Sequence, residues 1–198
     1  MRSNAKKVST LFLIVIVVMA VVFILQYKAF LSYMYPLKYK NFVVNYSQEY
    51  ELDPYLVSAL INVESHYDRE AQSSKDAKGL MQITPSTGKW AAEKLGIKSF
   101  NESLLFDPKT NIMIGCWYLN SIKKEFSLKE TETDLVLMLA SYNGGSGNVK
   151  KWLNNKAYSQ TGATLDQIPF KETQQYVKKV LWSIRIYKWL YPDIESTA

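Results

Sequence analysis

The chain opens with an apolar run that is long enough to cross a membrane, and this run limits what the rest can fold into. From Val8 to Leu25 the only polar side chains are Ser9 and Thr10, and about 18 apolar residues suffice for a membrane-spanning helix. The remainder of the 198-residue chain is too short for two domains of ordinary size and ample for one core. The sequence therefore predicts one globular domain behind one N-terminal transmembrane helix.

The residues around this run favour an uncleaved anchor over a cleaved secretory signal. Both kinds of segment begin with basic residues, but a signal usually has a shorter apolar region and a small-residue cleavage pattern after it. The run is followed instead by an aromatic and basic mixture typical of a membrane interface, namely Gln26, Tyr27, Lys28, Tyr33 and Tyr35, and it is preceded by Arg2, Lys6 and Lys7. We predict a cytoplasmic start and anchor in residues 1–28, a tether in 29–40 and the globular domain in 41–198.

Composition narrows the classes of partner. Lysine and arginine total 24 against 18 acids, a formal charge of +6 that suits an anionic partner such as cell-wall polymer or lipid headgroups. The lysines are scattered among acids without a basic block, so no nucleic acid is predicted. The single cysteine, Cys116, excludes an intrachain disulfide and fits an apolar helical stripe as a core residue. The single histidine, His66, has no second ligand at metal spacing, so we predict no metal and no cofactor.

Capping residues and helix breakers predict a domain that is mostly α. A capping side chain stands directly before a proline at Asp53, Thr84 and Asp107, as at the start of many helices. Thr131 with Asp134 resembles a capping box. The expected helices carry Phe42 to Tyr50, run from Pro54 through Glu64, from Pro85 to Gly96, from Pro108 to about Phe126, from Thr131 to Asn143, around Val149 to Leu153, and from about Glu172 to Tyr191.

Glu64 is an acid on an otherwise apolar helical stripe. In the second expected helix, Val57, Leu60, Ile61 and Glu64 share one face. Desolvation and the negative end of the helix dipole both disfavour the charged carboxylate there. Such an acid can hold a proton near neutral pH and deliver it, as protonation of a leaving sugar oxygen requires. The alternative is a helix-end acid paired with Arg69 or a lysine.

Four short motifs carry a resemblance to a known family. They are Glu64-Ser65, Gly79-Leu80-Met81-Gln82-Ile83-x-Pro85, Tyr142-Asn143-x-Gly145-x-Gly147-x-Val149 and Ile168-Pro169-x-x-Glu172-Thr173-x-x-Tyr176. Together and in this order they resemble the catalytic domain of the soluble lytic transglycosylase type, over about Asn41 to Tyr191. The resemblance implies a goose-type, lysozyme-like fold. It also implies cleavage of the β-1,4 bond between N-acetylmuramic acid and N-acetylglucosamine in peptidoglycan, ending in a 1,6-anhydro sugar. The chain departs from the family at Asp68 and Arg69, where a proline is common, and mildly at Gly144.

The resemblance also implies roles for individual residues. Glu64 would be the general acid and later the base, with the C6 hydroxyl of the substrate as nucleophile. The implied substrate-binding residues are Ser73, Gly79, Gln82, Tyr142, Asn143, Glu172 and Tyr176. Without the resemblance, Ser73 would be an ordinary loop serine, Gln82 an exposed amide and Glu172 a surface acid. Tyr142 and Tyr176 would be aromatic core residues, and Asn143 a helix cap. Ordinary glycosidases use a second carboxyl group, which Asp68, Glu70 or Asp76 could supply.

The leading hypothesis is a membrane-tethered lytic transglycosylase that acts on peptidoglycan on the extracytoplasmic face. The oligomeric state is not fixed by the sequence, and a monomer is expected. Two alternatives remain open. One is a hydrolytic muramidase on the same fold, and the other is a vestigial wall-binding component of an envelope assembly.

Overall fold

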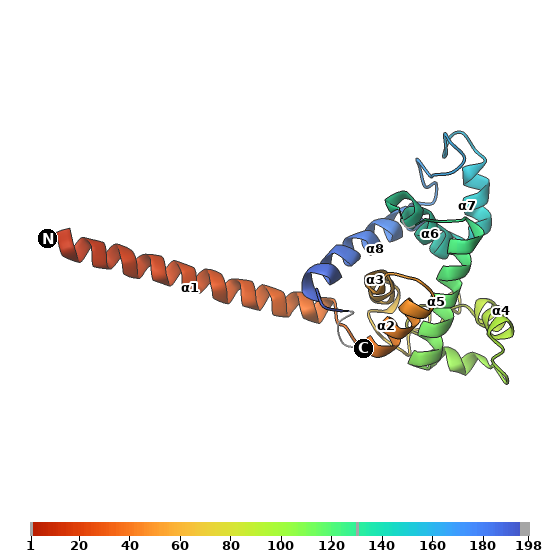
Figure 1. Ribbon diagram of the computed structural model, residues 1–198, viewed down its shortest axis with the longest axis horizontal. Coiled ribbons are helices and arrows are strands. Elements are labelled where there is room, and N and C mark those ends of the chain that lie inside the picture. The colour runs from red at the N-terminus through yellow and green to blue at the C-terminus, as the bar shows by residue number, and fades with distance from the viewer. Residues whose placement is uncertain (1, 130, 195–198) are drawn as a thin grey trace.

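The protein is built from helices (Figure 1). The computed structural model describes residues 2–129 and 131–194, with side chains from residue 13 onward; the predicted basic side chains Arg2, Lys6 and Lys7 and residues 195–198 lie outside this description. The elements are α1 (Arg2–Met34), α2 (Lys40–Glu49), α3 (Pro54–Ser65), α4 (Pro85–Leu95), the 3-10 helix η1 (Glu102–Phe106), α5 (Pro108–Glu125), α6 (Glu132–Gly144), α7 (Ser146–Leu153) and α8 (Lys171–Leu190). The described part has no β-strand and only isolated bridges, Gln72 to Lys78 and Lys78 to Ile83. The prediction of a mostly α fold is confirmed.

Helix α1 projects from the domain as a single rod (Figure 1). Its segment Leu13–Met34 has 22 residues with a mean hydropathy of 2.5 and none buried, and it is the one helix in the described part that is long and apolar enough to cross a membrane. The helix covers the first half of the predicted tether, because no helix breaker precedes Pro36.

The helix starts lie where the capping residues predicted them. The side chains of Asp53, Thr84 and Asp107 each accept a backbone hydrogen bond at the start of α3, α4 and α5, and each is followed by proline. Thr131 and Asp134 form the full capping box of α6. Helix α7 begins three residues before the predicted Val149, because a single residue, Gly145, ends α6 and starts α7.

The hydrophobic core is arranged around α3. Val57, Ala59, Leu60 and Ile61 are fully buried, and α3 packs mainly against α8 and α2, while α8 also packs against α6. Cys116 on α5 is fully buried, which confirms its prediction as a core residue. The stripe that carries Glu64 therefore faces the interior.

The domain is held directly against the end of α1. The Tyr187 hydroxyl donates a hydrogen bond to the Pro36 carbonyl (2.8 Å), and the Tyr191 hydroxyl donates one to the Tyr35 carbonyl (2.9 Å). The Tyr35 and Tyr187 rings also meet edge to face. Figure 1 shows the C-terminal end of α8 meeting the C-terminal end of α1. Only residues 35–39 separate α1 from α2.

Candidate active site

Glu64 stands in the last turn of α3, where the chain reverses direction. His66 caps the helix with φ 51°, and Tyr67 follows with φ 62°. Such positive φ values are uncommon outside glycine, and here Tyr67 is 2% exposed, so its ring is anchored in the core. The turn ends α3 at Ser65, one residue after Glu64, and leaves the Glu64 carboxyl group at the negative end of the helix.

The carboxyl group of Glu64 is partly buried and has one side-chain partner. The Tyr176 hydroxyl of α8 donates a hydrogen bond of 2.7 Å to Glu64 Oε1. Burial raises the pKa of Glu64 to about 7, while the Tyr176 hydrogen bond opposes this rise because it stabilises the carboxylate. Tyr142 of α6 lies close enough that the charge of Glu64, after burial, contributes to raising the pKa of the Tyr142 phenol. Glu64, Tyr142 and Tyr176 thus form one cluster, from three helices.

The loop 77–84 beside this cluster is held by three surrounding elements. Ser65 Oγ of α3 donates to the Leu80 carbonyl (2.8 Å). Asn111 Oδ1 of α5 accepts from the Met81 amide (2.8 Å), and the Tyr142 hydroxyl donates to the Met81 carbonyl (2.8 Å). Leu80 and Met81 are fully buried.

Two glycines allow the loop to pack this closely. Gly79 has φ 73°, and a side-chain carbon there would clash with the Leu105 carbonyl and with Asn111. At Gly115 of α5 the same carbon would clash with the Met81 side chain. The resemblance implies that Gly79 binds substrate, whereas the contacts that require glycine here are internal. Its role in binding stays a prediction.

Gln82 is half-buried at the end of this loop, with φ 49°. Its Nε2 group donates to the carbonyls of Ala71 (3.1 Å) and Gly79 (3.0 Å). Both N–H groups of the amide are therefore used inside the protein, and Oε1 is the part of the side chain left to accept from a ligand.

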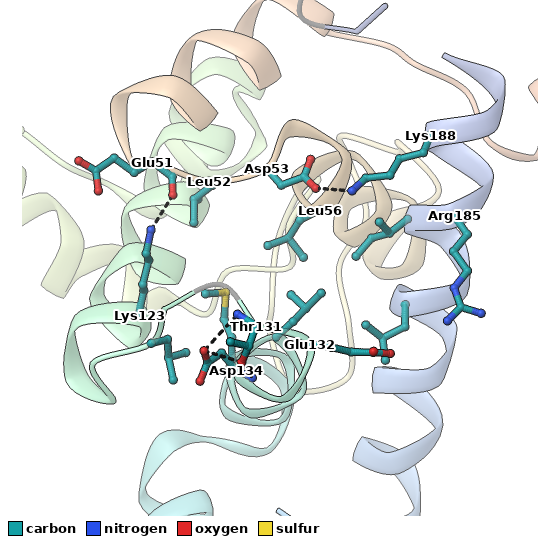
Figure 2. Close-up of a pocket in the computed structure, with 15 residues that line it drawn as sticks. Glu51, Leu52, Asp53, Leu56, Lys123, Thr131, Glu132, Asp134, Arg185 and Lys188 are labelled. Atoms are coloured by element: carbon teal, nitrogen blue, oxygen red, sulfur yellow. Dashed lines mark hydrogen bonds and ion pairs between the residues drawn. The ribbon is translucent and has the colours of Figure 1, made fainter. Parts of the chain in front are cut away.

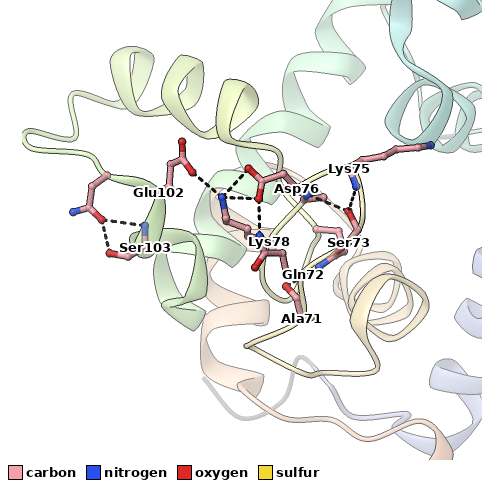
Figure 3. Close-up of polar contacts among 11 residues, drawn as sticks. Ala71, Gln72, Ser73, Lys75, Asp76, Lys78, Glu102 and Ser103 are labelled. Carbon is pink, nitrogen blue, oxygen red and sulfur yellow. Dashed lines mark hydrogen bonds and ion pairs between the residues drawn. The ribbon is translucent and has the colours of Figure 1, made fainter.

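The remaining predicted binding residues, Ser73, Asn143 and Glu172, are exposed. Ser73 Oγ accepts from the amides of Lys75 (3.3 Å) and Ala77 (3.1 Å), which shapes the loop after α3 (Figure 3). Asn143 Oδ1 accepts from Thr173 Oγ1 (2.8 Å). Glu172 is exposed, 4.0 Å from Lys75 Nζ, so the start of α8 and this loop face each other. The structure brings Glu64, Tyr142 and Tyr176 into direct proximity and leaves Ser73, Asn143 and Glu172 outside them.

Sequence reasoning missed the groups that hold the site in place. Lys78 is 7% exposed and pairs with Asp76 (2.9 Å) and Glu102 (2.7 Å), and these hydrogen bonds raise the pKa of Lys78 and lower that of Asp76 (Figure 3). Asn111 and Ser65 were also assigned no role. A signal was present for Asn111, because it lies four residues before Gly115 and eight before Leu119 on the apolar face of the expected helix, where a polar side chain normally has hydrogen-bond partners. No such signal marks Lys78 in the sequence.

A cavity of about 430 Å³ lies at the other end of α3 (Figure 2). It is lined by residues that flank or begin α3, by the first half of α6 and by the second half of α8, including Leu52, Leu56, Leu135, Met138 and Arg185. None of the predicted site residues lines this cavity. In the described residues no group of three or more His, Cys, Asp and Glu side chains could hold a metal ion.

A glutamic acid whose pKa is raised by burial to about 7, flanked by two tyrosines in a helical domain, defines a candidate acid–base site. The family model described as Transglycosylase SLT domain matches residues 41–164, so the chain belongs to this family. The resemblance inferred from the four motifs is thereby confirmed.

Individual relatives agree with this assignment. The soluble lytic murein transglycosylase of Escherichia coli K12 is 32% identical over 161 residues, which cover 80% of this chain and 24% of that protein. The membrane-bound lytic murein transglycosylase E of Buchnera aphidicola is 31% identical over 57% of this chain and 52% of its own length. The chain thus spans about a quarter of the length of the soluble relatives.

Solved structures share the fold. The 70 kDa soluble lytic transglycosylase of Escherichia coli superimposes with a TM-score of 0.70 at 29% identity, over 84% of this chain and 26% of that one. Its complex with bulgecin A gives 0.71 at 30% identity, over 82% and 26%. The lytic transglycosylase Slt of Pseudomonas aeruginosa, solved as an inactive glutamate-to-glutamine mutant, gives 0.66 at 29% identity, over 78% and 24%.

Proposed function

We propose that the chain is a membrane-anchored lytic transglycosylase that cleaves the β-1,4 bond between N-acetylmuramic acid and N-acetylglucosamine in peptidoglycan. The observation that carries the proposal is Glu64, whose burial raises its pKa to about 7 on a fold shared with lytic transglycosylases. A leaving sugar oxygen must be protonated as its bond breaks, and an acid with a pKa near the working pH suits this step.

In the proposed mechanism Glu64 acts first as acid and then as base. The protonated carboxyl group gives its proton to the glycosidic oxygen, the C1–O bond breaks, and an oxocarbenium-like sugar forms. The C6 hydroxyl of the same muramyl residue then attacks C1, and its proton returns to the Glu64 carboxylate. The product is a 1,6-anhydro sugar, and the enzyme returns to its starting protonation state.

The surroundings of Glu64 support a mechanism with one carboxyl group. Hydrolytic glycosidases use a second carboxyl group near the first. Burial raises the pKa of Glu64, and no described carboxylate contributes to the rise. Of the open candidates, Asp76 is paired with Lys78 and Glu70 with Arg69, while Asp68 is exposed and caps the amide of Glu70.

The predicted binding residues would contact the glycan around this acid. Tyr142 borders Glu64, and Gln82 offers Oε1 one residue after Met81, whose carbonyl accepts from Tyr142. We assign the other contacts to the exposed side chains Ser73, Asn143 and Glu172, to the backbone at Gly79, and to Tyr176 beside Glu64.

We further propose that α1 anchors the domain on the extracytoplasmic face of the membrane as a single span. Leu13–Met34 has the length and hydropathy for this, and some relatives are named membrane-bound. Residues 1–28 would then hold most of the anchor, 29–40 its exit from the membrane, and 41–198 the catalytic domain. Retention of the full chain in membranes after sodium carbonate extraction is the expected result, and release into the supernatant would contradict the anchor.

The decisive experiment is mass spectrometry of peptidoglycan digested by the purified full chain. Anhydro products lighter by one water than hydrolysed ones are expected. Glu64→Gln should lower the rate by about 10²-fold to 10⁴-fold, the usual contribution of a positioned acid. Asp68→Asn and Glu70→Gln are matched controls that should retain activity. Reducing-end products alone would indicate a hydrolytic muramidase, and unchanged digestion by Glu64→Gln would contradict the acid assignment.

A further inference from the structure

Helix α8 carries a row of alternating basic and aromatic side chains on its outer face. Lys178, Trp182, Arg185 and Trp189 are spaced by four, three and four residues, so they share one side of the helix. Trp182 is 58% exposed and Trp189 is 50% exposed, and both basic residues are exposed. We call these four residues the α8 stripe.

Apart from Arg185, which also borders the cavity beside α3, the α8 stripe is separate from the face that packs into the domain. The inner face of α8 is buried and includes Val177, Val180, Ile184 and Tyr187. In the described part of the protein no side-chain ring contact involves Trp182 or Trp189. Exposure of tryptophan to this extent is unfavourable, because removal of its large apolar surface from water lowers the free energy.

The stripe begins beside the exit of the anchor. The hydrogen bonds of Tyr187 and Tyr191 to Pro36 and Tyr35 hold this end of α8 next to the end of the apolar segment at Met34. Trp189 lies between these two tyrosines in sequence, and Trp182 is seven residues earlier, which is roughly 10 Å along a helix. In Figure 1, α8 rises obliquely from the end of α1, with α3 on one side and its open side toward the region through which α1 runs.

We propose that the α8 stripe rests on the surface of the membrane that α1 spans. Trp182 and Trp189 then lie among the lipid headgroups, where amphipathic aromatic rings are favoured, and Lys178 and Arg185 face anionic lipid phosphates. This inference rests on the proposed anchor, and it adds a second contact that fixes the tilt of the domain.

The test uses tryptophan fluorescence of the full chain at one copy per nanodisc. The five tryptophans all lie outside α1, so the anchor contributes no tryptophan emission. They are Trp90, Trp117, Trp152, Trp182 and Trp189. The discs contain phosphatidylglycerol and phosphatidylcholine brominated close to the headgroup, compared with the same lipids without bromine. Bromine should quench the wild-type emission, and Trp182→Phe/Trp189→Phe should lose most of this quenching.

A matched control is available in another exposed tryptophan. Trp90 on α4 is 43% exposed, and α4 lies at the end of the domain away from α1 (Figure 1). Trp90→Phe should keep the lipid quenching of the wild type. Lys178→Gln/Arg185→Gln should weaken the quenching in discs with phosphatidylglycerol, and added salt should do the same because it screens charges near the surface.

Several outcomes would overturn the proposal. Wild-type emission that is quenched by aqueous acrylamide and not by brominated lipid would place the stripe in water. Equal lipid quenching in Trp182→Phe/Trp189→Phe and wild type would place another tryptophan at the membrane. If the tryptophan emission is protected from acrylamide only at two copies per disc, a second copy of the chain covers the stripe. Failure of the anchor is distinguishable, since the chain would then not co-purify with the discs at all.

Discussion

Glu64 and Tyr176 stand 112 residues apart in sequence and meet at 2.7 Å. The sequence predicted both residues for the site, and the apolar stripe around Glu64 predicted an acid with a raised pKa. Their hydrogen bond could not be predicted, because it depends on how α3 packs against α8. For the same reason the sequence could not show that both amide protons of Gln82 are used inside the protein.

The Tyr176 hydroxyl lowers the pKa of Glu64 against the effect of burial. Tyr176→Phe should therefore raise this pKa further, since a hydrogen bond to the carboxylate is lost. Activity that requires protonated Glu64 declines above its pKa of about 7, so this alkaline limb should move to higher pH in the variant. The pH profile of the rate of peptidoglycan digestion measures the shift.

Tyr142→Phe is the comparison for this shift. Its hydroxyl donates to the Met81 carbonyl and not to Glu64. It should change the rate without the same displacement of the alkaline limb, and equal displacement in both variants would show that Tyr176 has no special role.

At the scale of elements, the helices were predictable and the loop between α3 and α4 was not. Asp53, Thr84 and Asp107 act locally, so their capping could be predicted from neighbouring residues. The loop 77–84 has its conformation set by distant partners, among them Asn111 and Tyr142. The motif Gly79 to Pro85 identified this loop. The side chains that hold the loop, Asn111 and Tyr142, lie on other helices.

Asn111 satisfies three backbone groups at once, the Met81 amide and the carbonyls of Lys78 and Leu105. Asn111→Ala would leave these buried groups without a partner, and each such group costs about 1 to 3 kcal/mol. We expect the free energy of unfolding to fall by roughly 3 kcal/mol or more, measured by urea denaturation.

Asn120 provides a matched control on the same helix. It is 7% exposed, and its side chain donates one hydrogen bond, to the Tyr50 carbonyl. Asn120→Ala should cost about 1 kcal/mol. Equal losses in the two variants would contradict the view that Asn111 is the main support of the loop.

For the whole molecule, the proton on Glu64 links stability to pH. Its folded pKa is raised from 4.5 to about 7, so between these values the folded state holds the proton more tightly than the unfolded state. The free energy of unfolding therefore falls as pH rises through this window, by roughly 3 kcal/mol in total.

Glu64→Gln removes this dependence because glutamine does not ionise. The variant should be more stable than the wild type at pH 8 and similar to it at pH 4, measured by thermal unfolding of the full chain at each pH. A difference that is the same at both pH values would mean that Glu64 titrates normally.

The junction between α1 and α8 sets how an anchored enzyme of this kind finds its substrate. Tyr187 and Tyr191 fasten the domain to Pro36 and Tyr35, and only residues 35–39 lie between α1 and α2. The domain is therefore not joined to α1 by a long flexible linker. Under the proposed anchoring it meets new glycan strands by lateral diffusion of the entire protein, so the encounter rate follows the viscosity of the bilayer rather than that of the surrounding solution.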